Sequence, residues 1–226
     1  MANINSRPWL HVHETLLGAL GPQHWWPGDS PFEVMVGAVL TQNTAWVNVE
    51  RAITNLKSAN ALSCPTILAM DDLALAEIIR PAGFFNVKAR RLLALCGFLR
   101  DEGVADAPER LGGTAPLPAL RQKLLAVHGV GEETADSILL YAIKLPSFVV
   151  DAYTRRIFKR LGLLAGDEAY GRIQAEFQRH LPRDLQLYNE YHALIVALGK
   201  EWCRPKPRCG LCPLAGFCTY ATATKN

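Results

Sequence analysis

The sequence predicts an all-α protein. Apolar residues recur at helical spacing through most of the chain, and Gly and Pro residues separate one such stretch from the next. No stretch alternates apolar and polar residues with the period of two that marks a half-buried strand. Together these observations favour helices joined by short turns.

The expected helices can be placed in order along the chain. The first covers residues 8–20 and ends at Gly21-Pro22. The second runs from Pro31 to about residue 58, with proline at a position where it opens helices well. Further helical patterns cover residues 66–70, 72–79, 86–101, 117–126, 132–144, 151–162, 167–179 and 185–200.

The composition is that of a globular protein. Of 226 residues, 50% are hydrophobic and 20% charged, which supports a sizeable core and argues against disorder. The longest apolar runs are too short to span a bilayer, and no secretory signal is recognised, so we expect a soluble cytoplasmic protein with no membrane partner. Residues 121–226 carry a net charge of +5 and residues 1–120 a net charge of −2, so the C-terminal half suits a polyanion.

Four of the six cysteines crowd into a short segment near the C-terminus: Cys203, Cys209, Cys212 and Cys218. Without an export signal, such a cluster favours a metal site over two disulfides. Cys64 and Cys96 are isolated, and we expect them to be small buried hydrophobic residues. The six histidines show no ligand spacing, and no site role is assigned to any of them.

Two neighbouring motifs carry candidate site residues, and the first of them favours binding of an anion such as a DNA phosphate. Residues 124–142 predict a helix, a Gly129-Val130-Gly131 turn and a second helix, whose N-terminal amides would favour an anion such as a phosphate. Such a hairpin would grip DNA backbone without reading its sequence. About twenty residues further on, Asp151 follows an apolar run at the start of another helix. Taken alone, Asp151 is explained as an ordinary N-cap.

The combined pattern resembles the helix-hairpin-helix DNA glycosylases of the endonuclease III superfamily, and matching segments run from about residue 25 to 218. The resemblance implies two helical domains flanking a DNA-binding cleft. A six-helix barrel would come from residues 29–140, with the hairpin at about 117–141, and a cluster-bearing domain from residues 1–28 plus 141–226. It also implies double-stranded DNA with a damaged base as the partner, DNA contacts from the hairpin and Thr134, and a nucleoid-associated monomer.

The resemblance further implies that the four cysteines hold a [4Fe–4S] cluster, which takes four cysteine ligands. The first gap, between Cys203 and Cys209, has five residues here where the family pattern has six, so a four-cysteine zinc site remains the alternative. The same loop contains three basic residues, Arg204, Lys206 and Arg208, which are expected to contact DNA phosphates.

The reaction is expected to differ from that of the bifunctional members, which carry a lysine two residues after the last hairpin glycine. Here that position is Glu133, and a carboxylate cannot form the Schiff base of a lyase. The expected reaction is therefore hydrolysis of the N-glycosidic bond, with Asp151 stabilising the oxocarbenium-like sugar and orienting or deprotonating water.

The substrate pocket most resembles that of the 3-methyladenine glycosylase branch, in which aromatic residues stack on the flipped base and an acidic residue takes the lysine position. By this resemblance Trp25, Trp26, Trp46 and Gln42 are pocket residues, with Gln42 entering the gap left by the extruded nucleotide. A cationic methylated purine suits an aromatic pocket. At least one of Trp25 and Trp26 is expected to be a core anchor at the domain junction, and for Trp46 the pocket and the core stay equally open. Two other functions stay open: an endonuclease III-type glycosylase for oxidised pyrimidines with weak or no lyase activity, and a catalytically silent damage-binding protein.

Overall fold

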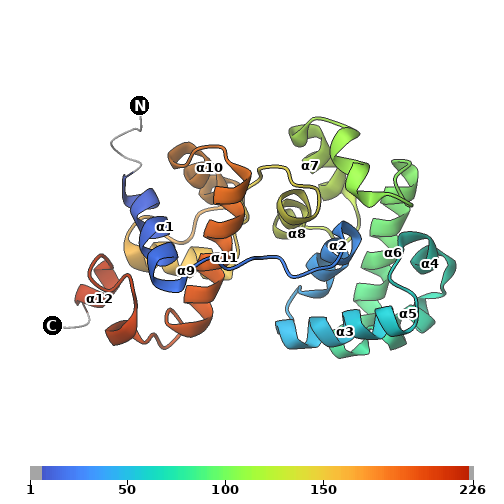
Figure 1. Ribbon diagram of the computed structural model, residues 1–226, viewed down its shortest axis with the longest axis horizontal. Coiled ribbons are helices and arrows are strands. Elements are labelled where there is room, and N and C mark those ends of the chain that lie inside the picture. Colours follow the sequence, from blue (N-terminus) through green and yellow to red (C-terminus); the bar gives the residue numbers. More distant parts are fainter. Residues whose placement is uncertain (1–6, 224–226) are drawn as a thin grey trace. The chain divides into compact units, whose positions relative to one another are not determined.

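The computed structural model describes residues 7–223 and confirms the all-α prediction, with no strand among these residues (Figure 1). The α-helices are α1 (Arg7–Leu20), α2 (Pro31–Leu40), α3 (Trp46–Ser58), α4 (Cys64–Ala69), α5 (Asp72–Ile78), α6 (Phe85–Asp101), α7 (Leu117–Ala126), α8 (Glu132–Ser137), α9 (Ala152–Leu161), α10 (Tyr170–His180), α11 (Leu185–Glu201) and α12 (Thr219–Ala223). Shorter helical turns are η2 (Arg80–Ala82), η3 (Pro108–Gly113), η4 (Ile138–Ala142) and η5 (Cys209–Leu211).

The chain forms two compact units. One comprises residues Pro27–Leu145, and the other comprises the residues up to Trp26 together with those from Pro146 onward. Residues 1–6 and 224–226, which belong to the expected cluster-bearing domain, lie outside the described residues. None of the described helices is long and apolar enough to cross a membrane.

Helix α2 is the centre of the Pro27–Leu145 unit. All of its residues from Phe32 to Leu40 are buried, and it packs against α3, α6, α8 and η4 (Figure 1). Its start is fixed locally, because the Ser30 hydroxyl accepts a hydrogen bond from the Glu33 amide at 3.1 Å and Pro31 occupies the first turn. An apolar helix of this kind supplies a rigid frame for the polar loop that follows it.

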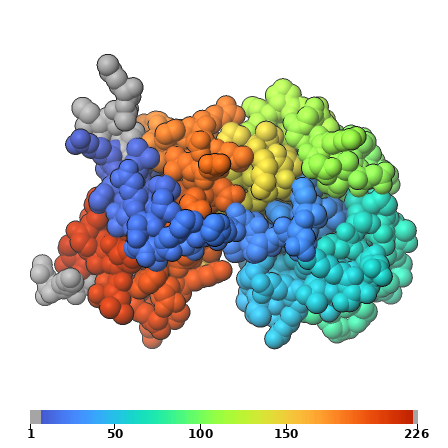
Figure 2. Space-filling view, in the orientation of Figure 1, coloured from blue at the N-terminus to red at the C-terminus, as the bar shows by residue number. Residues whose placement is uncertain are grey.

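Aromatic side chains form the core of the other unit. The Trp9 ring stacks on Phe158 at 5.1 Å and meets the edge of Phe177 at 4.8 Å, while Phe148 stacks on Phe177 at 4.0 Å. The Tyr191 hydroxyl donates to the Trp9 carbonyl at 2.6 Å, which joins α1 to α11. In the space-filling view the blue residues of α1 lie directly against the orange C-terminal helices of this unit (Figure 2).

Two predicted helices are wrong in extent. The single helix expected from Pro31 to about residue 58 is broken into α2 and α3 by residues 41–45. Asn43 there has a positive φ of 52°, and the Thr44 hydroxyl donates to the Ala82 carbonyl at 2.6 Å instead of continuing a helix. The helix expected over residues 132–144 is α8 followed by a π-helical turn, η4.

Candidate functional site

Asp151 caps helix α9 from a buried position. Its side chain is part of a residue only 8% exposed, and Oδ1 accepts hydrogen bonds from the Thr154 amide at 2.7 Å and the Thr154 hydroxyl at 2.8 Å. The second oxygen, Oδ2, lies 3.7 Å from Nε2 of His192 on α11. The cap therefore uses one carboxylate oxygen and leaves the other directed at an imidazole.

The surroundings of Asp151 favour its charged form. Burial alone would raise the pKa of this carboxyl group, but the imidazole of His192 and the hydrogen bonds from Thr154 outweigh burial and hold the pKa below its ordinary value. Asp151 is thus ionised at neutral pH. A buried carboxylate of this kind is better suited to stabilising a positive charge than to taking up a proton.

The hairpin turn between α7 and α8 packs against the Arg91 side chain of α6. Gly129 has a φ of 82°, and a Cβ placed on it would lie 2.2 Å from Cγ of Arg91. Both its conformation and the adjacent Arg91 side chain therefore require glycine. Val130 is 5% exposed and anchors the turn, whereas Gly131 is exposed. Arg121 on α7 stabilises the hairpin through two 2.9 Å bonds to the buried Asp136 on α8.

Gln42 is held against this hairpin by three partners. Its Nε2 donates to the Gly129 carbonyl at 3.0 Å and to the Thr134 hydroxyl at 2.8 Å, and its Oε1 accepts from Arg91. The structure thus brings Gln42, which the sequence analysis assigned to the substrate pocket, into contact with Gly129 and Thr134 of the hairpin segment. Because Thr134 is buried and bonded to Gln42, its place is beneath the hairpin and not on the exposed turn.

Glu133 lies in the first turn of α8 and is exposed. Its neighbour Glu132 pairs with Arg121 at 3.6 Å, while Asp136 is buried one turn further on. This first turn therefore carries carboxylates where a lyase would need an amine with a depressed pKa.

The predicted aromatic residues fall into two groups. The Trp25 and Trp26 rings lie 5.2 Å apart in one unit, and the Lys200 ammonium lies 5.5 Å from the Trp25 ring centroid. Trp46 belongs to the other unit, where it is half-buried at the start of α3 and its indole nitrogen donates to Glu50 at 2.7 Å.

The four clustered cysteines are free thiols of intermediate exposure. In the described part of the chain, no group of three or more His, Cys, Asp or Glu side chains is arranged to hold a metal ion. Their chemistry nevertheless fits a four-thiolate centre. Arg160 connects the two ends of the segment, because it donates to Sγ of Cys203 at 3.3 Å while its carbonyl accepts from Sγ of Cys218 at 3.3 Å. Cys64 and Cys96 are buried, as expected.

The basic residues of the cysteine loop are tied partly to the protein itself. Arg208 donates to Glu201 at 3.1 Å, and Arg204 donates to the Lys200 carbonyl at 2.7 Å. Lys206 is exposed. Of the three, Lys206 is the residue presented with its charge most available to a phosphate.

Sequence reasoning missed four residues that the structure places around these groups: His192, Arg91, Lys88 and Phe84. His192 lies against Asp151, and Arg91 donates to Gln42. Lys88 is buried beside residues 41–45, which we call the Gln42 loop. Phe84 is 71% exposed and has a φ of 47° at the start of α6. The only local signal is the Phe84-Phe85 pair after Gly83, of which Phe84 is exposed and Phe85 half-buried. The contacts of His192 with Asp151, of Lys88 with Leu40 and of Arg91 with Gln42 join residues 41 to 49 positions apart.

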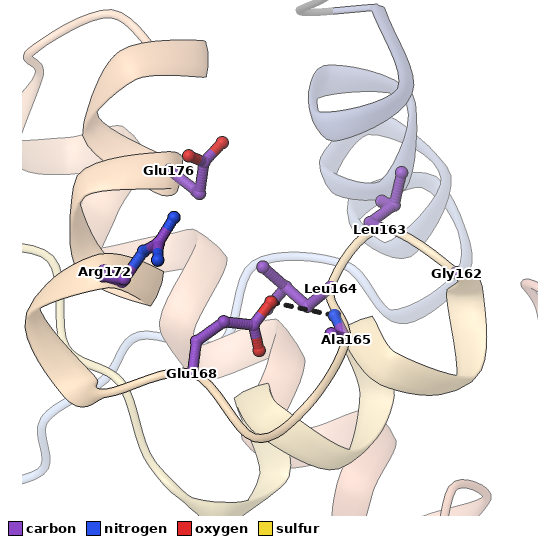
Figure 3. Close-up of a pocket in the computed structure, with 7 residues that line it drawn as sticks. All are labelled: Gly162, Leu163, Leu164, Ala165, Glu168, Arg172 and Glu176. Carbon is purple, nitrogen blue, oxygen red and sulfur yellow. Dashed lines mark hydrogen bonds between the residues drawn. The ribbon is translucent and has the colours of Figure 1, made fainter.

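A cavity of about 380 Å³ lies between the end of α9 and α10, and none of the predicted site residues lines it (Figure 3). Its Glu168 carboxylate already accepts from the amides of Ala165 at 2.8 Å and Gly166 at 2.7 Å. The Glu168 carboxylate therefore stabilises the turn at residues 165–168, and we assign the cavity no ligand.

Comparisons with known proteins agree with this fold and these motifs. The model of the HhH-GPD superfamily base excision DNA repair proteins matches residues 36–183. The putative DNA repair glycosylase MJ1434 of Methanocaldococcus jannaschii is 49% identical over 92% of this chain and 94% of its own length. A non-covalent endonuclease III–DNA complex has a TM-score of 0.83 at 22% identity, with 100% of this chain and 99% of that one covered. The 3-methyladenine DNA glycosylase MagIII of H. pylori, bound to 1,N6-ethenoadenine, has a TM-score of 0.73 at 32% identity, with 87% and 97% covered.

The chain belongs to the HhH-GPD superfamily of base excision DNA repair proteins, so the resemblance to the endonuclease III superfamily is confirmed. Within that class it is a base excision repair DNA glycosylase.

Proposed function

We propose that this glycosylase is monofunctional and releases an alkylated purine, of the 3-methyladenine type, from double-stranded DNA by hydrolysis. The proposal is carried by the chemistry of two positions considered separately: Asp151 is a buried, ionised carboxylate, and position 133 holds an exposed glutamate. A carboxylate can stabilise a cationic sugar, but neither residue can form an imine. The 32% identity to a solved 3-methyladenine DNA glycosylase supports the substrate class.

The chemistry follows from the charge on such a substrate. A purine methylated at ring nitrogen 3 carries a positive charge, so the glycosidic electron pair that moves onto the base on cleavage leaves the base neutral. The sugar then holds the positive charge, which the Asp151 carboxylate stabilises. Water adds to C1′ and loses a proton, and the product is an abasic site. The low pKa of Asp151 assigns it mainly this electrostatic role.

The recognition residues divide by their chemistry. We assign Trp25, Trp26 and Trp46 to stacking on the extruded base, where a cation over an aromatic face is worth about 0.5–2 kcal/mol. Gln42 fills the vacated position in the duplex, and the 129–131 turn with Lys206 and the neighbouring arginines contacts phosphates. Phe84, an exposed apolar side chain on a loop of the same unit as Gln42, fits a wedge between base steps.

Cys203, Cys209, Cys212 and Cys218 would hold a [4Fe–4S] cluster, with zinc as the alternative. Such a cluster, when bound, supplies a covalent staple for the loop. Arg160 orders the two ends of this segment, and Arg156 adds a 2.7 Å bond to the Cys203 carbonyl. A brown protein with about four iron and four sulfide per chain is expected. A colourless protein with one zinc ion would contradict the cluster.

The substrate is tested by incubating the protein with methylated duplex DNA and resolving released 3-methyladenine from 7-methylguanine. A parallel panel carries oxidised pyrimidines. Release of 3-methyladenine that is lost in Asp151→Asn supports the proposal. Release from the pyrimidine panel alone would replace it with endonuclease III-type specificity. Tight binding to damaged DNA without any release would replace it with a damage-binding function.

The monofunctional mechanism has its own test. Borohydride traps a Schiff base between an enzyme amine and an abasic sugar, and we expect no trapped complex with this protein. Glu133→Lys should not create efficient trapping, because position 133 is exposed and a lysine there lacks the burial by which a nucleophilic amine is deprotonated near neutral pH. A trapped wild-type complex would contradict the mechanism.

A further inference from the structure

Lys88 is buried without a charged partner among its hydrogen bonds. The residue is 1% exposed, and its ammonium donates to the Leu40 carbonyl at 2.7 Å, the Thr44 hydroxyl at 2.6 Å and the Ala82 carbonyl at 2.9 Å. All three acceptors are uncharged oxygens. A fully buried ammonium is costly, so an apolar side chain would serve simple core packing better.

The three acceptors of Lys88 lie on two separate segments. Leu40 and Thr44 bracket the 41–43 stretch that carries Gln42, while Ala82 lies in the loop that ends at the exposed Phe84. Thr44 itself donates to the same Ala82 carbonyl at 2.6 Å. Lys88 is therefore the point at which the ends of the Gln42 loop meet the 80–84 loop.

Arg91 continues this arrangement one turn further along α6. It donates to Oε1 of Gln42, and Nε2 of Gln42 donates to the Gly129 carbonyl and the Thr134 hydroxyl. Burial, and after it the charge of Arg91, lowers the pKa of Lys88 to about 8. Helix α6 thus presents two cations to the Gln42 loop: Lys88 fixes its backbone, and Arg91 fixes its side chain.

We propose that Lys88 is a positioning residue for base extrusion, which holds the backbone of the Gln42 loop so that the Gln42 amide enters the space left by the nucleotide. This inference rests on the proposed function. Lys88 touches neither the base nor the sugar in this assignment, and its effect passes through Leu40, Thr44 and Ala82 to Gln42. Its loss weakens recognition of a vacated base position and leaves general attraction to DNA unchanged.

The first experiment measures binding to two duplexes by fluorescence anisotropy. One contains a tetrahydrofuran abasic-site analogue, and the other is the matched intact duplex. We expect Lys88→Met to lose at least about tenfold in preference for the abasic duplex and Lys88→Arg to recover part of it, because arginine keeps a charged donor. The control is Lys57→Met, which removes a lysine whose partners are the carboxylates of Asp29 and Glu33. Equal preference in wild type and Lys88→Met would overturn the proposal.

A second measurement needs neither DNA nor substrate. Amide hydrogen exchange of residues 41–44 and 82–84 should be faster in Lys88→Met than in wild type, with α10 unchanged. Should Lys88→Met fail to fold, Thr44→Val removes one acceptor and is expected to produce the same local change and a smaller loss of preference. Uniform acceleration over the whole unit in Thr44→Val, or none, would overturn the positioning role. A wild-type protein with no abasic preference would overturn the role of Lys88 in base extrusion, whereas failure of the proposed function shows separately as no base release from methylated duplex DNA.

Discussion

The starts of α9 and α11 share one capping geometry and differ in everything around it. Asp151 accepts from the amide three residues on at 2.7 Å, and Asp184 does the same at 2.7 Å. Both residues have extended backbones, with φ of −112° and −125°. Capping alone therefore accounts for the local conformation of both aspartates.

Asp151 and Asp184 differ in their burial and in their hydrogen-bond and charge partners. Asp184 is exposed, whereas Asp151 is 8% exposed, carries a second bond from the Thr154 hydroxyl and faces His192. Stabilising a helix start requires none of these additions, and burial of a carboxylate is costly. The difference identifies what Asp151 has beyond a cap: an ionised carboxylate whose second oxygen is directed away from its own helix.

The largest effect should come from neutralising each aspartate while keeping its cap. Asparagine caps helices about as well as aspartate, so Asp151→Asn and Asp184→Asn form a matched pair. We expect base release to fall at least about 100-fold in Asp151→Asn, since the charge on the developing cation is lost, and to stay at the wild-type rate in Asp184→Asn. Single-turnover rates on methylated duplex measure both. Similar rates in the two variants would reduce Asp151 to a cap.

Some of this site was accessible from the sequence because its signals are local. An aspartate after the apolar run 148–150 and before a helix-forming segment is a cap by short-range rules, and the Gly129-Val130-Gly131 turn is equally local. The structure finds both at the expected positions. The catalytic and DNA-binding roles given to them stay predictions.

The helix break at residues 41–45 and the contact between His192 and Asp151 could not be predicted, because both depend on residues far apart in the sequence. The spacing of apolar residues does not predict the break at residues 41–45, because Lys88, more than forty positions away, binds Leu40 and Thr44 at its ends. His192 carries no local signal, since only the packing of α11 against α9 brings it to Asp151. Apolar spacing locates helices, but it does not show which polar side chain of one helix meets another.

The next effect tests the partner of Asp151. His192→Leu removes the imidazole at similar size, so burial is opposed only by Thr154 and the pKa of Asp151 rises. At pH values below the pKa, a rise of one pKa unit leaves about tenfold less ionised Asp151, so base release should be about tenfold slower there and should approach the wild-type rate at neutral pH. The acid limb of the pH–rate profile should move to higher pH. An unchanged limb would show that His192 does not act through the carboxylate.

The lowered pKa of the buried Asp151 should also make the free energy of unfolding depend on pH. The pKa of Asp151 is lower in the folded than in the unfolded chain, so its charge stabilises the fold above the unfolded pKa and this contribution disappears as the pH falls through the folded value. The free energy of unfolding of wild type relative to Asp151→Asn should therefore be constant near neutral pH and decrease below about pH 4. Urea denaturation at several pH values measures it. A difference that grows toward acid pH would mean that Asp151 is buried in its neutral form.

The smallest effect should come from removing the exposed cap altogether. Asp184→Ala leaves the Leu187 amide without its side-chain acceptor, and loss of such a cap costs about 1 kcal/mol. Because Asp184 is exposed and water can replace its bond, base release at 25 °C should match wild type once the protein is folded. Urea denaturation and the base-release assay on one preparation separate the two quantities. A loss of activity beyond the loss of folded protein would mean that the start of α11 also serves the reaction, for example by shifting His192 two turns along the same helix.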